Sequence, residues 1–212
     1  MKSKALLASA VTIFILIIDQ ISKIWIKTTM RINDQFNVFG SWFRIHFVEN
    51  EGMAMGISWG GELGKYSLTI FRMIAICFII YYIYILIKKN ASKTFIVVMS
   101  LILAGAIGNV IDSLFYGLIF SESYHQIATV VPWGTGYTSF MQGHVVDMIS
   151  VQLFKIPEFI PGYGGQKFFP FIFNIADAAI SVGIILIVIF QKKFFPETED
   201  EKVTTNETSS IA

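Results

Sequence analysis

Carboxyl, amide and ammonium groups lie inside long apolar runs of this sequence. A charged side chain at the centre of a membrane span costs roughly 2.5–3.5 kcal/mol on insertion scales, so those that occur usually serve a function. Two carboxyl groups brought close together could hydrolyse a peptide bond, because one keeps its proton while the other ionises. The groups lie in three motifs: DQISK, with Asp19 and Lys23; AGAIGNVID, with Asn109 and Asp112; and FNIAD, with Asn174 and Asp177.

The apolar runs that carry these motifs are long enough to cross a membrane. A hydrocarbon core needs about 20 residues of helix at about 1.5 Å each. The 212-residue chain is 54% hydrophobic and 15% charged, a composition typical of integral membrane proteins. Its net charge of +1 offers no basic surface for nucleic acid. We expect four spans, at about residues 5–26, 66–87, 95–115 and 171–190.

The motif residues of three spans fall at a similar depth if the N-terminus is cytoplasmic. Helix rise places Asp19 and Asp177 roughly 20 Å, and Asp112 roughly 26 Å, from the inner boundary. Against a core of about 30 Å, all three lie in the outer third, which predicts one shallow polar site. Small residues at Gly105 and Gly108 should let the helices approach closely. Lysines crowd the short inner flanks of the spans, which favours cytoplasmic N- and C-termini.

Two outer loops follow from this arrangement. Apolar and polar residues alternate over 43–48, which predicts a strand, and MAMGIS at 53–58 could be the return strand. The second loop, at about 116–170, is too long for a structureless connection. The tail at 196–212 is acidic and polar, so we predict a disordered cytoplasmic segment. Residues 1–195 would then form a single membrane-embedded domain.

Taken in order along the chain, the motifs resemble those of lipoprotein signal peptidase, also called signal peptidase II. This is a family of bacterial aspartyl proteases of the cytoplasmic membrane. Any one motif is weak evidence, but five in order on four expected spans are specific. The resemblance covers about residues 18–190. The matching stretches are DQISK (19–23), NEGMAMG (50–56), AGAIGNVID (104–112), HVVDM (144–148) and FNIAD (173–177).

The resemblance implies an all-α membrane protein with four transmembrane helices, a small extracytoplasmic β-cradle and a long outer loop. It implies an aspartic endopeptidase that removes signal peptides from prolipoproteins by cutting before a diacylglyceryl-modified cysteine. The enzyme would lie in the bacterial cytoplasmic (inner) membrane, with its active site near the outer face. The expected partners are these prolipoproteins and membrane lipid, with inhibition by globomycin-type cyclic peptides and no cofactor or metal.

The resemblance also assigns residues by motif. The catalytic aspartates fall on Asp147 and Asp177. Residues expected to bind substrate or shape the site are Asn50, Gly108, Asn109, Asp112, Asn174, Asp19 and Lys23.

Two features depart from the family pattern. Arginine usually follows the aspartate of the third-helix motif, but Ser113 stands here, and Arg72 is a candidate to replace its charge. The link from Asp112 to Asp147 is also longer than in the family, so residues 116–142 are interpreted as an insertion. Because loop closure costs little per added residue, we expect most of this insertion to be dispensable for folding.

Other uses of the same residues stay open. His144 and Asp147 are three residues apart and could share a metal, although a third ligand would be needed and no H-E-x-x-H occurs. The intramembrane carboxylates could instead serve a small ion- or proton-coupled transporter, but such a relay should reach both membrane faces. Asp19 and Lys23, four residues apart, could form a structural ion pair rather than take part in chemistry.

Overall fold

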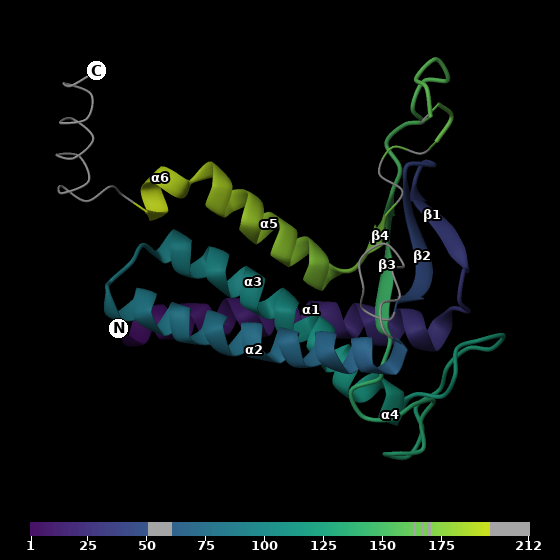
Figure 1. Cartoon of the computed structure of the whole chain (residues 1–212), viewed down its shortest axis with the longest axis horizontal. Helices are drawn as coiled ribbons and strands as arrows, with labels where there is room; N and C mark the ends of the chain where they lie inside the picture. Colours follow the sequence, from purple (N-terminus) through teal and green to yellow (C-terminus); the bar gives the residue numbers. More distant parts are fainter. Residues whose placement is uncertain (51–60, 163, 167, 169–170, 196–212) are drawn as a thin grey trace.

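Four apolar helices run side by side in the computed structural model, which describes residues 1–50, 61–162, 164–166, 168 and 171–195. A four-stranded sheet stands at one end of these helices, and the N-terminus and a short helix, α6 (Gln191–Phe194), lie at the other end (Figure 1). The four helices are α1 (Lys2–Thr29), α2 (Gly61–Lys88), α3 (Lys93–Ile111) and α5 (Ile175–Ile189).

Among the described residues, three helical segments are long and apolar enough to cross a membrane: Lys2–Thr29, Leu63–Lys88 and Lys93–Ile119. The fourth helix, α5, is apolar but has only 15 residues, or roughly 22 Å of helix. The span expected at 171–190 is therefore wrong at its start. Asn174 has an extended backbone and caps the helix, so α5 cannot begin before Ile175.

The third span continues further than expected. After α3, the chain forms one π-helical segment, η2 (Asp112–Tyr116), and the short helix α4 (Gly117–Ile119). The span expected to end at residue 115 thus ends at Ile119. Single π-helical turns inside α-helices occur often at functional sites, and this one contains an aspartate of the third motif.

The sheet is antiparallel, with strand order β1-β2-β3-β4. The strand predicted over 43–48 is confirmed as part of β2, whereas the return strand expected at 53–58 lies outside the described residues. Asp147, expected in a loop, lies instead in β3, because the β-branched run around it pairs with β2 and places Asp147 opposite Val48. The strands are β1 (Gln35–Phe39), β2 (Phe43–Asn50), β3 (Val145–Val151) and β4 (Ile172–Phe173).

Glycines on α3 allow the helices to approach closely, as the sequence predicted. A Cβ atom at Gly105 would lie 2.2 Å from the carbonyl oxygen of Ala176, and one at Gly108 would lie 2.7 Å from Oδ2 of Asp19. α3 therefore packs against both α1 and α5 in the same region. Any larger residue at these positions would separate the helices that carry the polar motifs.

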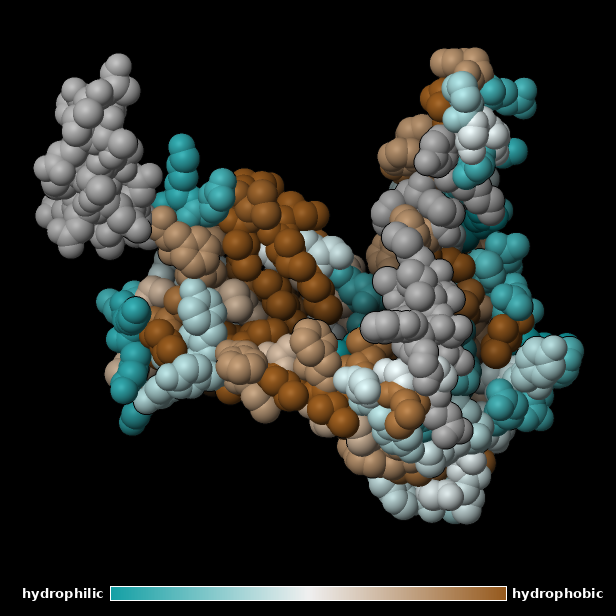
Figure 2. All heavy atoms as spheres, in the orientation of Figure 1, coloured by the Kyte–Doolittle hydropathy of each residue, from teal (hydrophilic) through white to brown (hydrophobic). Residues whose placement is uncertain are grey.

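The half of the bundle remote from the sheet is packed with apolar side chains. Hydrophobic residues also cover the flank of α5 that faces outward (Figure 2). The buried residues of this cluster include Ala8, Ile83, Leu86, Phe95, Ile96, Val98, Met99, Leu103 and Phe194.

Candidate active site

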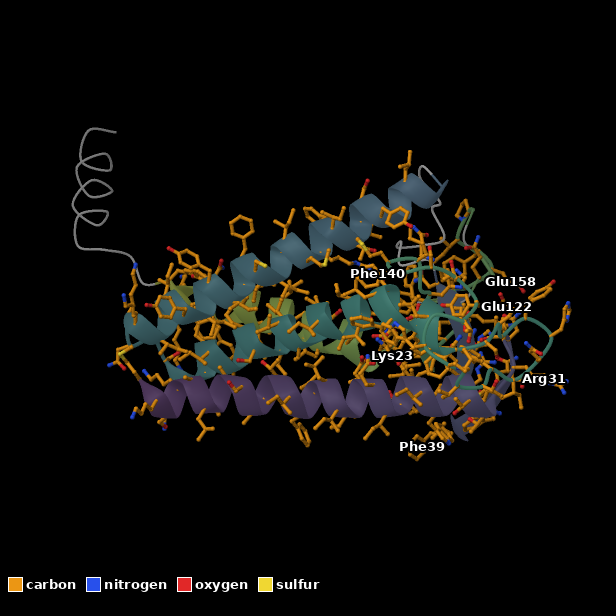
Figure 3. All side chains as sticks on the ribbon, turned by 90° about the horizontal axis from the view of Figure 1, so that it is seen from below. Lys23, Arg31, Phe39, Glu122, Phe140 and Glu158 are labelled. Carbon is orange, nitrogen blue, oxygen red and sulfur yellow. The ribbon has the colours of Figure 1, made fainter. Side chains whose placement is uncertain are left out.

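The polar residues of α1 and α3 meet around the buried ammonium of Lys23, at the end of the bundle near the sheet (Figure 3). Its Nζ lies 2.9 Å from Oδ2 of Asp19 and 2.9 Å from Oδ2 of Asp112. It also donates a hydrogen bond of 2.9 Å to Oδ1 of Asn109. The predicted pairing of Lys23 with Asp19 is confirmed, and the same cation also neutralises a carboxylate on a second helix.

Asp19 connects this cluster to the start of α5. Its Oδ1 accepts a 2.9 Å hydrogen bond from the backbone N–H of Ala176, in the first turn of α5. That N–H belongs to the four helix-initial donors that have no partner within their own helix, and a carboxylate is favoured at that end of the helix. The absence of a side chain at Gly108 leaves room for Asp19 to reach this position.

Gln20 is a member of the cluster that the sequence analysis did not identify. Its Nε2 donates to Oδ1 of Asp112 at 3.0 Å, and its Oε1 accepts from the hydroxyl of Tyr116 at 3.1 Å. The signal was present, because Gln20 is another polar residue within an apolar run.

Asp177 lies at the start of α5, where it forms a reciprocal cap with Asn174. The backbone N–H of Asp177 donates to Oδ1 of Asn174 at 2.9 Å, and the backbone N–H of Asn174 donates to Oδ2 of Asp177 at 3.3 Å. The other carboxylate oxygen, Oδ1, accepts a 2.7 Å hydrogen bond from Nδ2 of Asn109. The FNIAD motif thus ends a strand, caps a helix and presents a half-buried carboxylate.

Asp147 reaches the same place from β3. Its Oδ1 accepts from Nδ2 of Asn174 at 2.7 Å, and its Oδ2 accepts from Nδ2 of Asn50 at 3.1 Å. Burial, followed by the charge of Asp177, raises the pKa of Asp147 to about 7, although the two amide donors favour its charged form. One asparagine, Asn174, therefore contacts both carboxylates.

All nine residues singled out from the sequence belong to one connected group. Asn109 joins its two halves, because Lys23 and Asn174 both donate to Oδ1 of Asn109 while its Nδ2 donates to Asp177. The network was predictable as a shared depth on three helices. Its connection to β3 was not, because the strand pairing that brings Asp147 inward depends on loops whose path no local pattern fixes.

Ser113, which stands where the family usually has arginine, contacts its own helix. Its hydroxyl donates to the backbone oxygen of Asn109 at 3.1 Å. Arg72 on α2 is close enough to interact electrostatically with Asp177, Asp112 and Asp147. Arg72 thus remains a candidate for the charge that Ser113 lacks.

Comparisons with known proteins agree with this geometry. The family model described as signal peptidase (SPase) II matches residues 11–193. The chain belongs to the signal peptidase II family. Members of this family are aspartic peptidases that remove signal peptides from prolipoproteins, so the predicted enzyme class is confirmed.

Individual relatives match nearly the whole chain. The lipoprotein signal peptidase of Porphyromonas gingivalis is 43% identical over 94% of each chain, and that of Staphylococcus aureus is 32% identical over 91% of this chain and 92% of its own. A solved bacterial membrane enzyme, determined by the in meso method at 2.3 Å resolution, superposes with a TM-score of 0.56. It is 27% identical, with 91% of this chain and 92% of that one covered. The chain is therefore a multi-pass bacterial membrane enzyme.

Neither alternative use of the carboxylates gains support from the geometry. Within the described part of the chain, no three histidine, cysteine, aspartate or glutamate side chains form a group that could hold a metal ion. Family membership decides against the transporter reading.

Proposed function

We propose that Asp147 and Asp177 are the catalytic pair with which this peptidase cleaves prolipoproteins. The observation that carries the proposal is their common partner: Asn174 donates its side-chain N–H to Asp147 and its backbone N–H to Asp177. Burial and the nearby charge of Asp177 raise the pKa of Asp147 to about 7. A proton on Asp147 suits this group to act as the acid, and we assign the role of base to Asp177.

Each carboxyl group then has a separate role. The Asp177 carboxylate takes a proton from water, and the water oxygen attacks the carbonyl carbon of the scissile peptide bond. Asp147 gives its proton to the carbonyl oxygen as that oxygen becomes negative. When the tetrahedral intermediate collapses, the leaving nitrogen takes the proton from Asp177, the C–N bond breaks, and one hydroxyl of the intermediate returns a proton to Asp147 as the new carboxyl group forms. Every proton is accounted for within the pair, and no covalent intermediate with the enzyme forms.

The remaining network residues fix the pair in place. Asn50, Asn109 and Asn174 hold three of the four carboxylate oxygens by side-chain amides without adding charge. Lys23 contacts both Asp19 and Asp112, which ties the first helix to the third span next to the pair. Close packing at Gly108, together with these contacts, gives the rigid support that an acid–base site needs.

The family and the ends of the helices support a proposal for the substrate and the orientation. We propose that the bond cut precedes a diacylglyceryl-modified cysteine and that the pair lies near the outer face of the bacterial cytoplasmic membrane, with both termini inside. Lysines gather at the end of the bundle opposite the sheet, as the positive-inside rule requires. Residues 1–195 act as one domain, and globomycin-type cyclic peptides should compete for the site. The tail at 196–212 lies outside the described residues.

The experiment is cleavage of a purified, diacylglyceryl-modified prolipoprotein by single variants in detergent. Asp147→Asn and Asp177→Asn should each reduce the rate by at least about 10²-fold, because each removes a group that transfers a proton. The matched control is Asp34→Asn, since Asp34 is an exposed carboxylate whose Oδ2 accepts a hydrogen bond from the backbone N–H of Arg31. Full activity in either pair variant, with normal thermal unfolding, would remove the aspartyl mechanism. The same assay on precursor with an unmodified cysteine tests whether the lipid is required.

A further inference from the structure

A second buried ion-pair cluster lies one helical turn beyond Lys23 on α1. The ammonium of Lys27, with no exposed surface, contacts the Glu49 carboxylate on β2 and donates to the hydroxyl of Ser123 at 2.8 Å. Ser123 in turn donates to the same Glu49 oxygen at 2.6 Å. The three groups satisfy one another away from water, so none can be removed without leaving a buried polar partner.

Aromatic rings and a histidine close the cluster. The Lys27 ammonium lies 4.8 Å from the ring centre of Tyr137 and 5.5 Å from that of Phe120, both within cation–π range. The Tyr137 hydroxyl accepts from the backbone N–H of His144 at 2.6 Å, and Nδ1 of His144 lies 3.3 Å from the other Glu49 oxygen. The pKa of Glu49 is about 2, because these partners outweigh its burial.

Most of these partners belong to the segment interpreted as an insertion. Phe120, Ser123 and Tyr137 all lie within 116–142, and Ser123 has no exposed surface. Phe120 also packs in the apolar cluster that includes Ile26 and Val146. These contacts conflict with the expectation that most of this segment is dispensable for folding. The length of the segment could not show that its side chains form part of the buried core.

The strand register connects this cluster to Asp147. Side chains alternate between the two faces of a strand, and Val48 pairs with Asp147 while Glu49 pairs with Val146. Asn50 therefore shares the face of Asp147 and bonds it at 3.1 Å, whereas Glu49 shares the face of Val146. The Lys27 cluster thus holds Glu49 on the face of the sheet opposite Asp147. Glu49 directly precedes Asn50, whose amide contacts Asp147.

We propose that Ser123, acting through Glu49 and Asn50, is a positioning residue for Asp147, so that the insertion clamps the catalytic strand pair. The inference rests on the catalytic pair proposed above. Asn50 pairs with Val145 and directly follows Glu49, so the position of its amide depends on how Glu49 is held. Without the Ser123 hydroxyl, Glu49 loses one of its anchors and Asn50 gains freedom to leave Asp147. A displacement of about 1 Å at a reacting group can lower a rate on the order of 10²-fold.

The test compares two identical substitutions in the same segment of the full-length enzyme. Ser123→Ala removes the contact with Glu49, whereas Ser121→Ala removes only a bond from the backbone N–H of Thr129, at 3.0 Å, and a weaker one from its hydroxyl. Initial rates are measured against the concentration of diacylglyceryl-modified prolipoprotein in detergent. We expect Ser123→Ala to lower kcat by about 10- to 100-fold with KM nearly unchanged, and Ser121→Ala to change neither.

A double-variant cycle separates positioning from a general loss of structure. If Ser123 acts through Asn50, then Ser123→Ala should change kcat by less than about twofold when Asn50→Ala is already present. Equal loss of kcat with and without Asn50 would overturn the proposal, and so would a Ser123→Ala enzyme that matches Ser121→Ala. Should Ser123→Ala fail to fold, Ser123→Cys enters the same cycle under the same criteria.

One further variant keeps the two proposals apart. If Asp147→Asn remains active, the catalytic pair itself is wrong, and this inference falls with it. If Asp147→Asn is inactive while Ser123→Ala keeps full kcat, the catalytic pair stands and only the clamp is overturned.

Discussion

Lys23 and Lys27 lie one turn apart on α1, both without exposed surface, and each is surrounded by a different kind of structure. Lys23 contacts groups carried by helices alone: Asp19 on its own helix, and Asn109 and Asp112 on the third span. Lys27 contacts β2, a loop and two aromatic rings. The change occurs where α1 leaves the helical bundle and meets the sheet.

The two clusters also differ in charge balance. One cation faces two carboxylates around Lys23, and neither carboxylate has exposed surface. Around Lys27, one cation faces one carboxylate, which is also in contact with His144, a side chain with 31% exposure. A buried ion pair is weak evidence of net stabilisation, but breaking one leaves an uncompensated charge. The comparison therefore predicts that the two lysines are unequally tolerant of loss.

The largest effect on stability is expected from Lys23→Ala. It leaves Asp19 and Asp112 buried together without their cation, which should destabilise the protein by about 3–5 kcal/mol. Thermal unfolding in detergent measures this. Replacing both Asp19 and Lys23 by apolar residues should recover only part of the loss, because Asp112 still lacks its cation. Complete recovery in the double variant would mean that Lys23 serves Asp19 alone.

A smaller effect is expected from Lys27→Ala. Glu49 keeps its hydrogen bond from Ser123, and His144 can donate to the other oxygen, so we expect a loss of about 1–3 kcal/mol. The same unfolding assay provides the measurement, with Lys88→Ala as control, because Lys88 is exposed at the far end of α2. A loss as large as that of Lys23→Ala would contradict the difference drawn between the clusters.

An effect no larger than that of Lys27→Ala is expected from a pH dependence of the Lys27 cluster. The pKa of Glu49 is about 2 in the folded protein and ordinarily about 4.5, so the folded state favours its charged form. The resulting stability, on the order of 1–3 kcal/mol, should be fully present above pH 4.5 and lost as the pH falls toward 2. Thermal unfolding of the parent and Glu49→Gln should therefore differ at pH 6 and converge near pH 2. A difference that stays constant across this range would show that the charge of Glu49 contributes nothing.

The sequence predicted much of the helical part of the site, because helix geometry is local. Residues three or four apart share a face, which placed Lys23 beside Asp19 and Asn174 beside Asp177. The predicted helix boundaries were wrong where side chains rather than hydropathy set them. The cap at Asn174 makes α5 begin after the predicted start at 171, and the π-helical turn extends the third span to Ile119.

By itself, the sequence determined which polar residues lie within apolar helices, and it predicted their depth, because helix rise relates a residue's position in an apolar run of about 20 residues to its depth. The tertiary structure alone decided that Asp147 lies in a strand and that Ser123 reaches Glu49. Lys27 and Glu49 are 22 residues apart, and Lys27 and Ser123 are 96 apart. Contacts between residues so far apart in the sequence depend on the paths of loops and on strand register. Sequence periodicity predicts neither of these.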